Sequence, residues 1–290
     1  MEKQARIAVL ITAYKNEKQV NRLINHLVND FDIYVHVDTK SNIKIVSHER
    51  VFVYKEFKIY WGNVNLVYSI LSLLKHAHKN DYDRYLLITG QDLPTKTNSK
   101  ITEFFSQNRD IEYIEMYKMP DKRWGKAGGM DRVAKYWPNH FHKMHGKWHK
   151  SLRLAFGFCK LMCNIASKLH PRPMDYEFWG GAGWFNLTHT CVDEIIRYTD
   201  MNTSFVKRFK HTWCSDEVFF QTIVNPLHGL QIVNDSLRYL NWDYTPGFPK
   251  SLGEEDFEDI IGSNAMFARK FDETIDNRVI EMIYTHIEEN

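Results

Sequence analysis

The chain has 290 residues, of which 43% are apolar, 14% aromatic and 26% charged, and its 38 Lys and Arg nearly balance its 36 Asp and Glu. This composition can build a large buried core and excludes disordered, collagen-like and coiled-coil chains. The net charge of only +2 argues against a nucleic-acid partner. The composition is that of a globular protein.

The sequence also argues against a membrane-spanning or secreted protein. No apolar run approaches the roughly 18 to 20 residues that a membrane-spanning helix requires. The first apolar run is interrupted at Thr12 and followed by Lys15 and Glu17, which is typical of a first strand and not of a signal peptide. The chain holds four cysteines without disulfide or zinc-site spacing, namely Cys159, Cys163, Cys191 and Cys214. We expect a cytoplasmic protein.

The first hundred residues alternate between strand and helix patterns. Apolar runs predict strands at residues 7–12, 33–37, 51–54 and 85–89. Apolar residues at helical spacing predict helices at residues 17–28 and 64–78, the second with Asn63 as its cap. This order is typical of a Rossmann-like α/β fold, with a mainly parallel sheet flanked by helices.

The remainder of the chain is less regular. Strands are predicted near residues 112–117, 184–188, 230–233 and 236–240, and helices at 152–169, after Thr188, at 217–224 and from Glu273. No repeat or low-complexity linker divides the chain. We expect a single domain over residues 1–290, with a regular first part over 1–110 and a less regular second part over 111–290.

The ends of the predicted strands suit a nucleotide pocket. Ligands of open parallel sheets bind beyond the carboxyl ends of the strands. Small or polar residues stand there, at positions 13–14, 36–38 and 89–92. The dinucleotide-binding, P-loop, serine-hydrolase and zincin motifs are absent, so the nucleotide site is of another kind.

Asp92 follows a buried strand in the string TGQDLPTKTN. Pro94 forces the chain to turn, which places Asp92 at the ligand end of the sheet. Taken alone, the pattern favours a carboxylate that caps a turn over one that contacts a ligand.

Six sequence blocks, in one order along the chain, resemble a single enzyme family. They are HVDTK at 36–40, YWGNVNLVYSILSLLK at 60–75, GQDLPTKTN at 90–98, GGAGWFNLT at 180–188, SDEVFFQTI at 215–223 and FARKFD at 267–272. Together they resemble the core-2/I-branching N-acetylglucosaminyltransferase and peptide O-xylosyltransferase family, glycosyltransferase family 14. The resemblance implies a GT-A fold and inverting transfer from a UDP-sugar, with no metal or other cofactor.

The resemblance also implies a catalytic base and a cation pair. Glu217 matches the base that takes the proton of the acceptor hydroxyl as its oxygen attacks the anomeric carbon. Spacing alone would favour a helix cap and an acidic first turn over 215–217. Arg238 and Lys270 match the two cations that hold the diphosphate in place of a metal, although each alone is typical of a solvated surface charge.

Further pocket residues follow from the same resemblance. The uridine site is expected at Ala13, Tyr14, Asp38 and Tyr60. Asp38 alone would equally suit the capping of a strand end. The acceptor side is expected at Glu115 and Arg123, with Trp124 as the adjacent anchor. The wider donor and acceptor pocket is completed by Trp61, Asp92, Gly181, Trp184 and Asp216, although Trp184 equally suits a place in the core.

The chain departs from the animal members of the family. Only 20 residues separate Glu217 from Arg238, so a segment that carries acceptor contacts is missing, and the animal disulfide cysteines and luminal anchor are absent as well. These departures suggest a bacterial-type relative and leave the acceptor open.

A basic insertion distinguishes residues 132–172. This segment holds nine Lys or Arg, five His and no acidic residue. The apolar residues of 152–169 recur every three or four positions, which predicts an amphipathic helix. Packing of its apolar face on the core is favoured over contact with an anionic membrane, where a lipid-linked acceptor could be held at the inner face of the cell membrane.

The sequence therefore predicts a metal-independent inverting glycosyltransferase. The donor sugar expected is N-acetylglucosamine, with xylose second, and the acceptor is a saccharide or glycolipid hydroxyl. A non-catalytic saccharide- or nucleotide-binding module on the same fold is the alternative from another class. A metal-dependent nucleotidyltransferase would require clustered acids at the strand ends, and the sequence lacks them.

Overall fold

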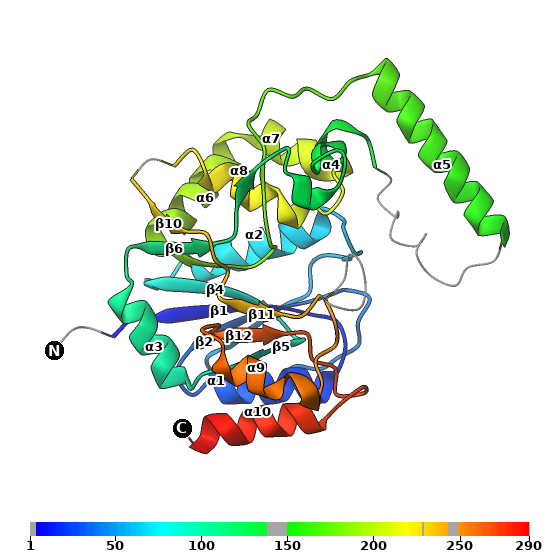
Figure 1. The fold of residues 1–290 in the computed structure, drawn as a ribbon. Helices are drawn as coiled ribbons and strands as arrows, with labels where there is room; N and C mark the ends of the chain where they lie inside the picture. The colour runs from blue at the N-terminus through cyan, green and yellow to red at the C-terminus, as the bar shows by residue number, and fades with distance from the viewer. Residues whose placement is uncertain (1–3, 138–149, 228, 243–248, 290) are drawn as a thin grey trace.

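A computed structural model describes residues 4–137, 150–227, 229–242 and 249–289 (Figure 1). A seven-stranded sheet forms its centre, in the order β10-β6-β9-β4-β1-β2-β3. Strands β1, β2, β3 and β4 are mutually parallel, whereas β9 runs antiparallel to both β4 and β6. The strands are β1 (Ile7–Ala13), β2 (Asp32–Val37), β3 (Val51–Tyr54), β4 (Arg84–Thr89), β6 (Ile111–Ile114), β9 (Phe185–Thr188) and β10 (Gln231–Val233). The predicted α/β fold with a mainly parallel sheet is confirmed.

Helices cover both faces of this sheet (Figure 1). Along β1, Ile7, Val9 and Ile11 pack into one apolar cluster and Ala8 and Leu10 into another, as the two-residue repeat of a strand requires. The first cluster includes side chains of α1 (Glu17–Leu27), α3 (Asn98–Gln107), α9 (Phe257–Gly262) and α10 (Arg278–Glu289). The second includes α2 (Asn65–Ala77), α6 (His189–Met201), α7 (Thr203–Arg208) and α8 (Phe219–Val224).

The described structure also has a three-stranded and a two-stranded sheet outside the central sheet. One has the order β11-β12-β5, built from β11 (Arg238–Leu240), β12 (Phe267–Arg269) and β5 (Asp92–Pro94). Its register sets Arg269 opposite Asp92, which lie 177 positions apart in the sequence. The other sheet pairs β7 (Tyr117–Lys118) with β8 (Trp179–Gly180).

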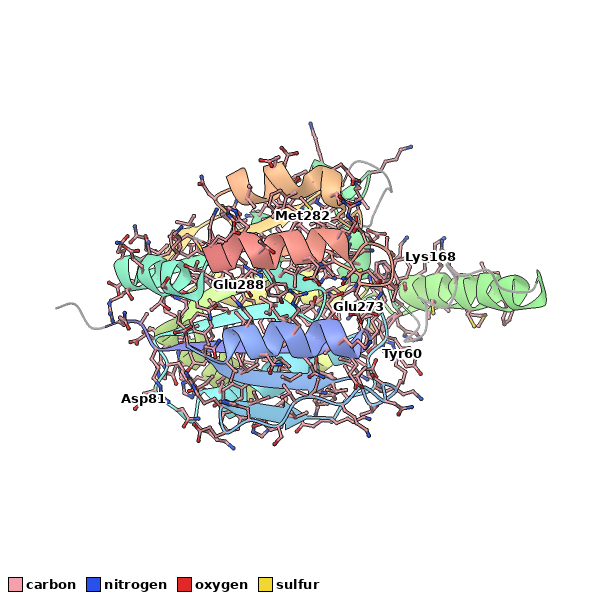
Figure 2. All side chains as sticks on the ribbon, turned by 90° about the horizontal axis from the view of Figure 1, so that it is seen from below. Tyr60, Asp81, Lys168, Glu273, Met282 and Glu288 are labelled. Atoms are coloured by element: carbon pink, nitrogen blue, oxygen red, sulfur yellow. The ribbon has the colours of Figure 1, made fainter. Side chains whose placement is uncertain are left out.

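Within its described residues, the basic insertion includes the end of α4 (Met130–Ala134) and the whole of α5 (Lys150–Leu169), and α5 stands away from the body. Figures 1 and 2 both show α5 projecting from the molecule. The packing of its apolar face on the core, which the sequence favoured, is therefore wrong for the described side chains, since Phe158, Leu161 and Leu169 are exposed. No helix among the described residues is both long and apolar enough to cross a membrane.

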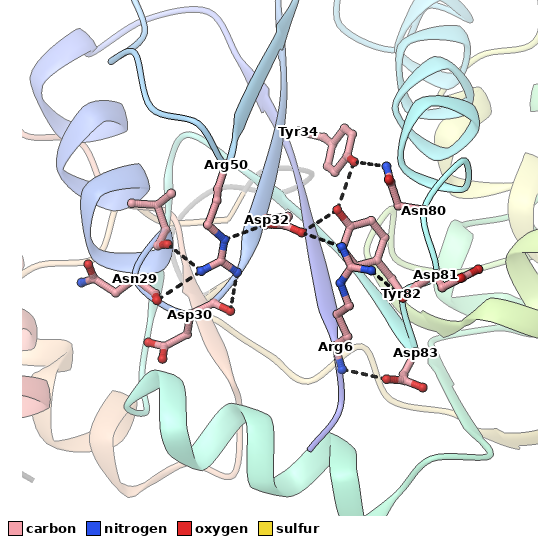
Figure 3. Close-up of polar contacts among 11 residues, drawn as sticks. Arg6, Asn29, Asp30, Asp32, Tyr34, Arg50, Asn80, Asp81, Tyr82 and Asp83 are labelled. Atoms are coloured by element: carbon pink, nitrogen blue, oxygen red, sulfur yellow. Dashed lines mark hydrogen bonds and ion pairs between the residues drawn. The ribbon is translucent and has the colours of Figure 1, made fainter. Parts of the chain in front are cut away.

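A polar network fastens the amino ends of the central strands (Figure 3). The Asp32 carboxylate accepts hydrogen bonds from Arg50 at 2.6 Å, from the Tyr82 hydroxyl at 2.7 Å and from Arg6 at 3.4 Å. Arg50 also donates to the carbonyls of residues 28–30, which connect α1 to β2. Burial raises the pKa of Asp32, but the hydrogen bonds from Tyr82 and Arg50 outweigh burial and hold the pKa below its ordinary value.

Replacement of Asp32 by Asn should lower the free energy of unfolding at pH 7 by about 1–3 kcal/mol, because the buried Tyr82 hydroxyl and two arginines lose a charged acceptor. A carboxylate with a depressed folded pKa contributes stability above its unfolded pKa and loses it as the pH falls through the folded value. The difference between wild type and variant should therefore shrink below about pH 4. Urea unfolding at pH 7 and pH 3 measures it, with Asp259→Asn at an exposed position of α9 as the control. An undiminished difference at pH 3 would contradict the assignment.

Candidate active site

A cavity of about 310 Å³ lies at the carboxyl ends of β1, β2 and β4, where the sequence predicts a nucleotide pocket. Its lining includes Thr12, Ala13, Tyr14, Lys15, Asp38, Lys40, Trp61, Thr89, Gln91 and Arg269. The rings of Tyr14 and Trp61 are 54% and 46% exposed, so they offer aromatic surface that the core does not use. Exposed aromatic rings beside a polar strand end suit the binding of a flat heterocycle.

Asp38 and Tyr60, both expected at the uridine site, lie in two different hollows. Asp38 lines the cavity and is buried, and its carboxylate accepts from the backbone amides of Lys40 at 2.9 Å and Ile59 at 3.3 Å. Asp38 therefore also fastens the loop after β2, as its capping alternative proposed. Tyr60 lines a neighbouring hollow instead, and its ring lies 4.1 Å from the ammonium of Lys40.

Asp92 is fully buried and holds a cation at the cavity wall. Its carboxylate accepts from the backbone amide of Thr89 at 2.8 Å and from the Thr89 hydroxyl at 2.9 Å. The Arg269 guanidinium donates to the same carboxylate at 2.8 Å and lies 5.0 Å from the Trp184 ring. Asp92 thus caps the turn after β4 and orients Arg269, a cavity residue that our sequence analysis did not identify.

Arg238, which the family resemblance assigns to a diphosphate, lies in the interior, and that role remains a prediction. Arg238 is 9% exposed, and its guanidinium donates to the carbonyls of Ser236 and Leu87 and to the side chain of Asn186. It is not among the residues that line the cavity, whereas Arg269 is. Burial lowers the pKa of Arg238 to about 10. Arg238 therefore joins β11 to β4 and β9.

Lys270, the other predicted cation, belongs to a positively charged group. Burial lowers its pKa, and the charges of Arg269 and Lys15 lower it further. Lys15 is itself paired with Asp272, which also lies near Lys270. Lys15, Lys40 and Arg269 line the cavity, so three cations border it, and Lys270 lies within electrostatic reach of Arg269 and Lys15.

Glu217 ends a single 3₁₀ turn, η4 (Ser215–Glu217), and forms a short ion pair with Arg132. The Glu217 side chain is 35% exposed, so it can meet a ligand. The Arg132 guanidinium lies 3.9 Å from the centre of the Trp124 ring, which fixes its direction. Burial would lower the pKa of Arg132, but the Glu217 carboxylate outweighs burial and raises it. Sequence analysis missed Arg132 because it counted this residue only as part of a basic segment.

Asp216 connects the Glu217 turn to the cavity cations. Burial, and then the negative charge of Glu217, raise the pKa of Asp216 to about 7, against the opposing effects of Arg132 and Arg269. The acidic turn and the cavity are neighbours, because a Cβ on Gly183 would lie 3.0 Å from the Asp216 carboxylate, and the ring of the next residue, Trp184, lies 5.0 Å from Arg269, which lines the cavity.

Three glycines let the chain approach this turn closely. The Gly181 amide donates to the Glu217 carbonyl at 2.9 Å, and a Cβ on Gly181 would lie 1.8 Å from the carbonyl oxygen of Glu115. A Cβ on Gly180 would lie 2.5 Å from the Trp124 ring, and one on Gly183 3.0 Å from the Asp216 carboxylate. The backbone at Gly181 therefore packs directly against the backbone at Glu115 and Glu217, and a larger residue would not fit there.

The predicted acceptor residues gather near this turn. Burial raises the pKa of Glu115. The positive charge of Arg123 lowers this pKa, and the negative charge of Glu217 raises it. The Arg123 side chain is 56% exposed, is paired with Asp121 at 2.9 Å, and lies 3.5 Å from the centre of the Tyr117 ring. An aromatic surface with charged groups at its edge can hold a sugar ring through its apolar face and its hydroxyls.

No three His, Cys, Asp or Glu side chains gather in a metal-binding arrangement within the described ranges. The absence of a metal requirement remains a prediction. Two acids near the cavity instead form ion pairs with protein cations, Asp92 with Arg269 and Glu217 with Arg132.

Comparisons with known proteins agree with this geometry. The sequence profile described as "Branch: Core-2/I-Branching enzyme" matches residues 7–261. Curated relatives include "Xylosyltransferase 2" of Rattus norvegicus, 23% identical over 97% of this chain and 34% of the relative. "Xylosyltransferase oxt" of Drosophila pseudoobscura pseudoobscura is 23% identical, and "Xylosyltransferase 1" of Homo sapiens is 22% identical. These cover 96% and 94% of this chain but 33% and 29% of the relatives, so the chain spans about a third of their length.

The fold has an α/β architecture consistent with the GT-A type. The chain belongs to the Core-2/I-Branching enzyme family, because the family profile matches most of its length.

Replacement of Gly181 by Ala should destabilise the protein by about 2 kcal/mol or more, because the new methyl group would overlap the Glu115 carbonyl. The matched control is Gly262→Ala in α9, where an added Cβ meets nothing within 4 Å, and its stability should stay within about 1 kcal/mol of wild type. Thermal unfolding measures both. Equal melting temperatures for the two variants would show that the close approach at Gly181 is not required.

Proposed function

We propose that this protein is a metal-independent inverting glycosyltransferase that transfers a sugar from a UDP-sugar to a hydroxyl of a saccharide acceptor. The observation that carries the proposal is the partly exposed Glu217, set beside a strand-end cavity that is bordered by cations. N-acetylglucosamine is the donor sugar we favour.

The cavity supports a uridine diphosphate in two parts. Tyr14 and Trp61 supply exposed aromatic rings for the uracil, and Asp38 supplies a carboxylate at the end of β2. Arg269 and Lys270 are the cations proposed for the diphosphate. Arg269 is pre-oriented by the buried Asp92, so little conformational entropy is lost when it meets an anion.

Glu217 is the base in this proposal. Its carboxylate takes the proton of the acceptor hydroxyl while the hydroxyl oxygen bonds to the anomeric carbon and the bond from that carbon to UDP breaks. The departing diphosphate carries the bonding electron pair, and the positive charges of Arg269 and Lys270 stabilise it. Arg132 is a positioning residue that holds Glu217 until an acceptor hydroxyl replaces the ion pair.

The acceptor is proposed to bind between Glu115, Trp124 and Trp184. Glu115 lies within electrostatic reach of Glu217, and Trp184 faces Arg269, so the two sides of this space adjoin the base and the donor cations. A saccharide or a glycolipid suits such a site. A glycolipid acceptor would place the enzyme at the inner face of the cell membrane, with the segment 132–172 in contact with lipid.

Xylose is the alternative donor sugar, because several curated relatives carry the name xylosyltransferase. A screen of UDP-sugars for slow donor hydrolysis separates the two donors. A non-catalytic nucleotide-binding module is the alternative from another class, and it would bind UDP without hydrolysing any donor.

Replacement of Glu217 by Gln should reduce transfer and donor hydrolysis by about 10²-fold or more, because the base is lost. UDP affinity, measured by calorimetry, should change little. Glu281→Gln is the matched control, since Glu281 forms a similar ion pair with Arg22 on the surface between α1 and α10. Survival of turnover in Glu217→Gln would show that another group is the base.

Donor turnover should persist in excess EDTA, because protein cations take the place of a metal. Replacement of Lys270 by Met should lower turnover by about 10-fold to 10²-fold through the loss of one phosphate contact. Lys118→Met, which removes an exposed lysine from β7, serves as the control. A requirement for added manganese would overturn the metal-free mechanism.

A further inference from the structure

Five apolar side chains of α5 form one exposed stripe, which we call the α5 stripe. Its members are Phe158, Leu161, Met162, Ile165 and Leu169, and their exposed fractions are 63%, 54%, 48%, 41% and 70%. Positions that recur every three or four residues lie on one face of a helix, so the five side chains are neighbours. A contiguous exposed apolar surface of this kind marks an interaction site.

The helix is held so that the α5 stripe faces away from the body. Near its carboxyl end, the Ser167 hydroxyl accepts from the backbone amide of Tyr136 at 2.9 Å. The buried Arg172 donates to the carbonyls of Lys135 at 2.9 Å and His211 at 3.2 Å, which fastens the chain that follows the helix. In Figure 2, Lys168 marks the part of α5 nearest the body, and the rest of the helix projects outward.

The charges of α5 select the kind of surface that can cover the stripe. Its 20 residues include four cations and no acid, namely Lys150, Arg153, Lys160 and Lys168. An apolar face combined with Lys and Arg is the pattern of helices that lie in the interface of an anionic bilayer. Each such cation near the surface adds to the attraction to acidic lipids.

We propose that α5 docks this protein on an anionic bilayer surface, with the α5 stripe in the boundary between headgroups and acyl chains. Pairing with the α5 stripe of a second copy is disfavoured by charge, because two helices that carry only cations would be brought together with no carboxylate to offset them. A bilayer of acidic lipids would bury the apolar stripe and attract the cations.

Docking would also bring the catalytic turn close to lipid. Arg132, the partner of Glu217, lies in α4, and the amide of Tyr136, just beyond α4, donates to the Ser167 hydroxyl in α5 at 2.9 Å. A lipid-linked saccharide in the same bilayer would therefore be presented to the side of the molecule that carries Glu217. This last step rests on the proposed function, whereas the docking itself does not.

Flotation of the full chain with phosphatidylcholine vesicles that contain about 30% phosphatidylglycerol tests the docking. The wild type should float at low salt, bind less in about 0.5 M NaCl, and bind pure phosphatidylcholine weakly. The variant Leu161→Gln/Ile165→Gln should bind roughly tenfold more weakly or worse, because two apolar contacts with the acyl chains are lost. The matched control is Met201→Gln/Ile275→Gln, which alters two apolar side chains exposed by 71% and 66% outside α5 and should float like the wild type.

Absence of flotation at low salt, or equal flotation of the α5 variant and the wild type, would overturn the proposal. A wild-type dimer that becomes monomeric in the α5 variant, seen by light scattering, would assign the stripe to a second copy and overturn it as well. Hydrolysis of UDP-N-acetylglucosamine without vesicles separates this result from the proposed reaction. The α5 variant should keep wild-type hydrolysis, whereas Glu217→Gln should lose hydrolysis and still float.

Discussion

The ion pair between Asp92 and Arg269 is the interaction on which the ligand end of this molecule depends. A fully buried carboxylate is costly unless charged and polar groups surround it, and here the Thr89 amide, the Thr89 hydroxyl and Arg269 do so. The carboxylate thereby closes the turn after β4, fastens β12 to β5 and aims a guanidinium at the cavity wall. One buried charge thus shapes the backbone and supplies the site with a fixed cation.

The site separates its charges into two neighbouring groups. Lys15, Arg269 and Lys270 make the cavity side positive, which suits a diphosphate. Asp216 and Glu217 make the adjoining turn negative, and Arg132 is paired with Glu217. In the proposed reaction, the acidic turn would supply the base and the cations would stabilise the leaving group, so both groups would act on one carbon.

Sequence reasoning succeeded where function follows local chemistry and failed where it follows long-range packing. Ala13, Tyr14 and Asp38 were identified as cavity residues because strand ends in an open sheet point to one edge. Arg238 was assigned to the diphosphate from the family resemblance, and no local signal shows that its guanidinium donates to buried carbonyls. Arg132 was missed because its partner lies 85 positions away. The apolar residues of α5 predicted a helix, but amphipathic spacing is the same for a helix that packs on a core and for one that meets lipid.

The sequence by itself determined the α/β fold, since the alternation of buried strands and amphipathic helices leaves few other arrangements. It also indicated the family, and it predicted a pocket at the carboxyl ends of β1, β2 and β4, where the structure has a cavity. The tertiary structure alone decided which charged side chains line the cavity and which are paired in the interior. Such pairing depends on residues far apart in the sequence. Asp92 and Arg269, for example, meet only when β12 pairs with β5. It also decided that α5 stands clear of the body, with apolar side chains exposed. The sequence of a helix shows that it has an apolar face, but it does not show what covers that face.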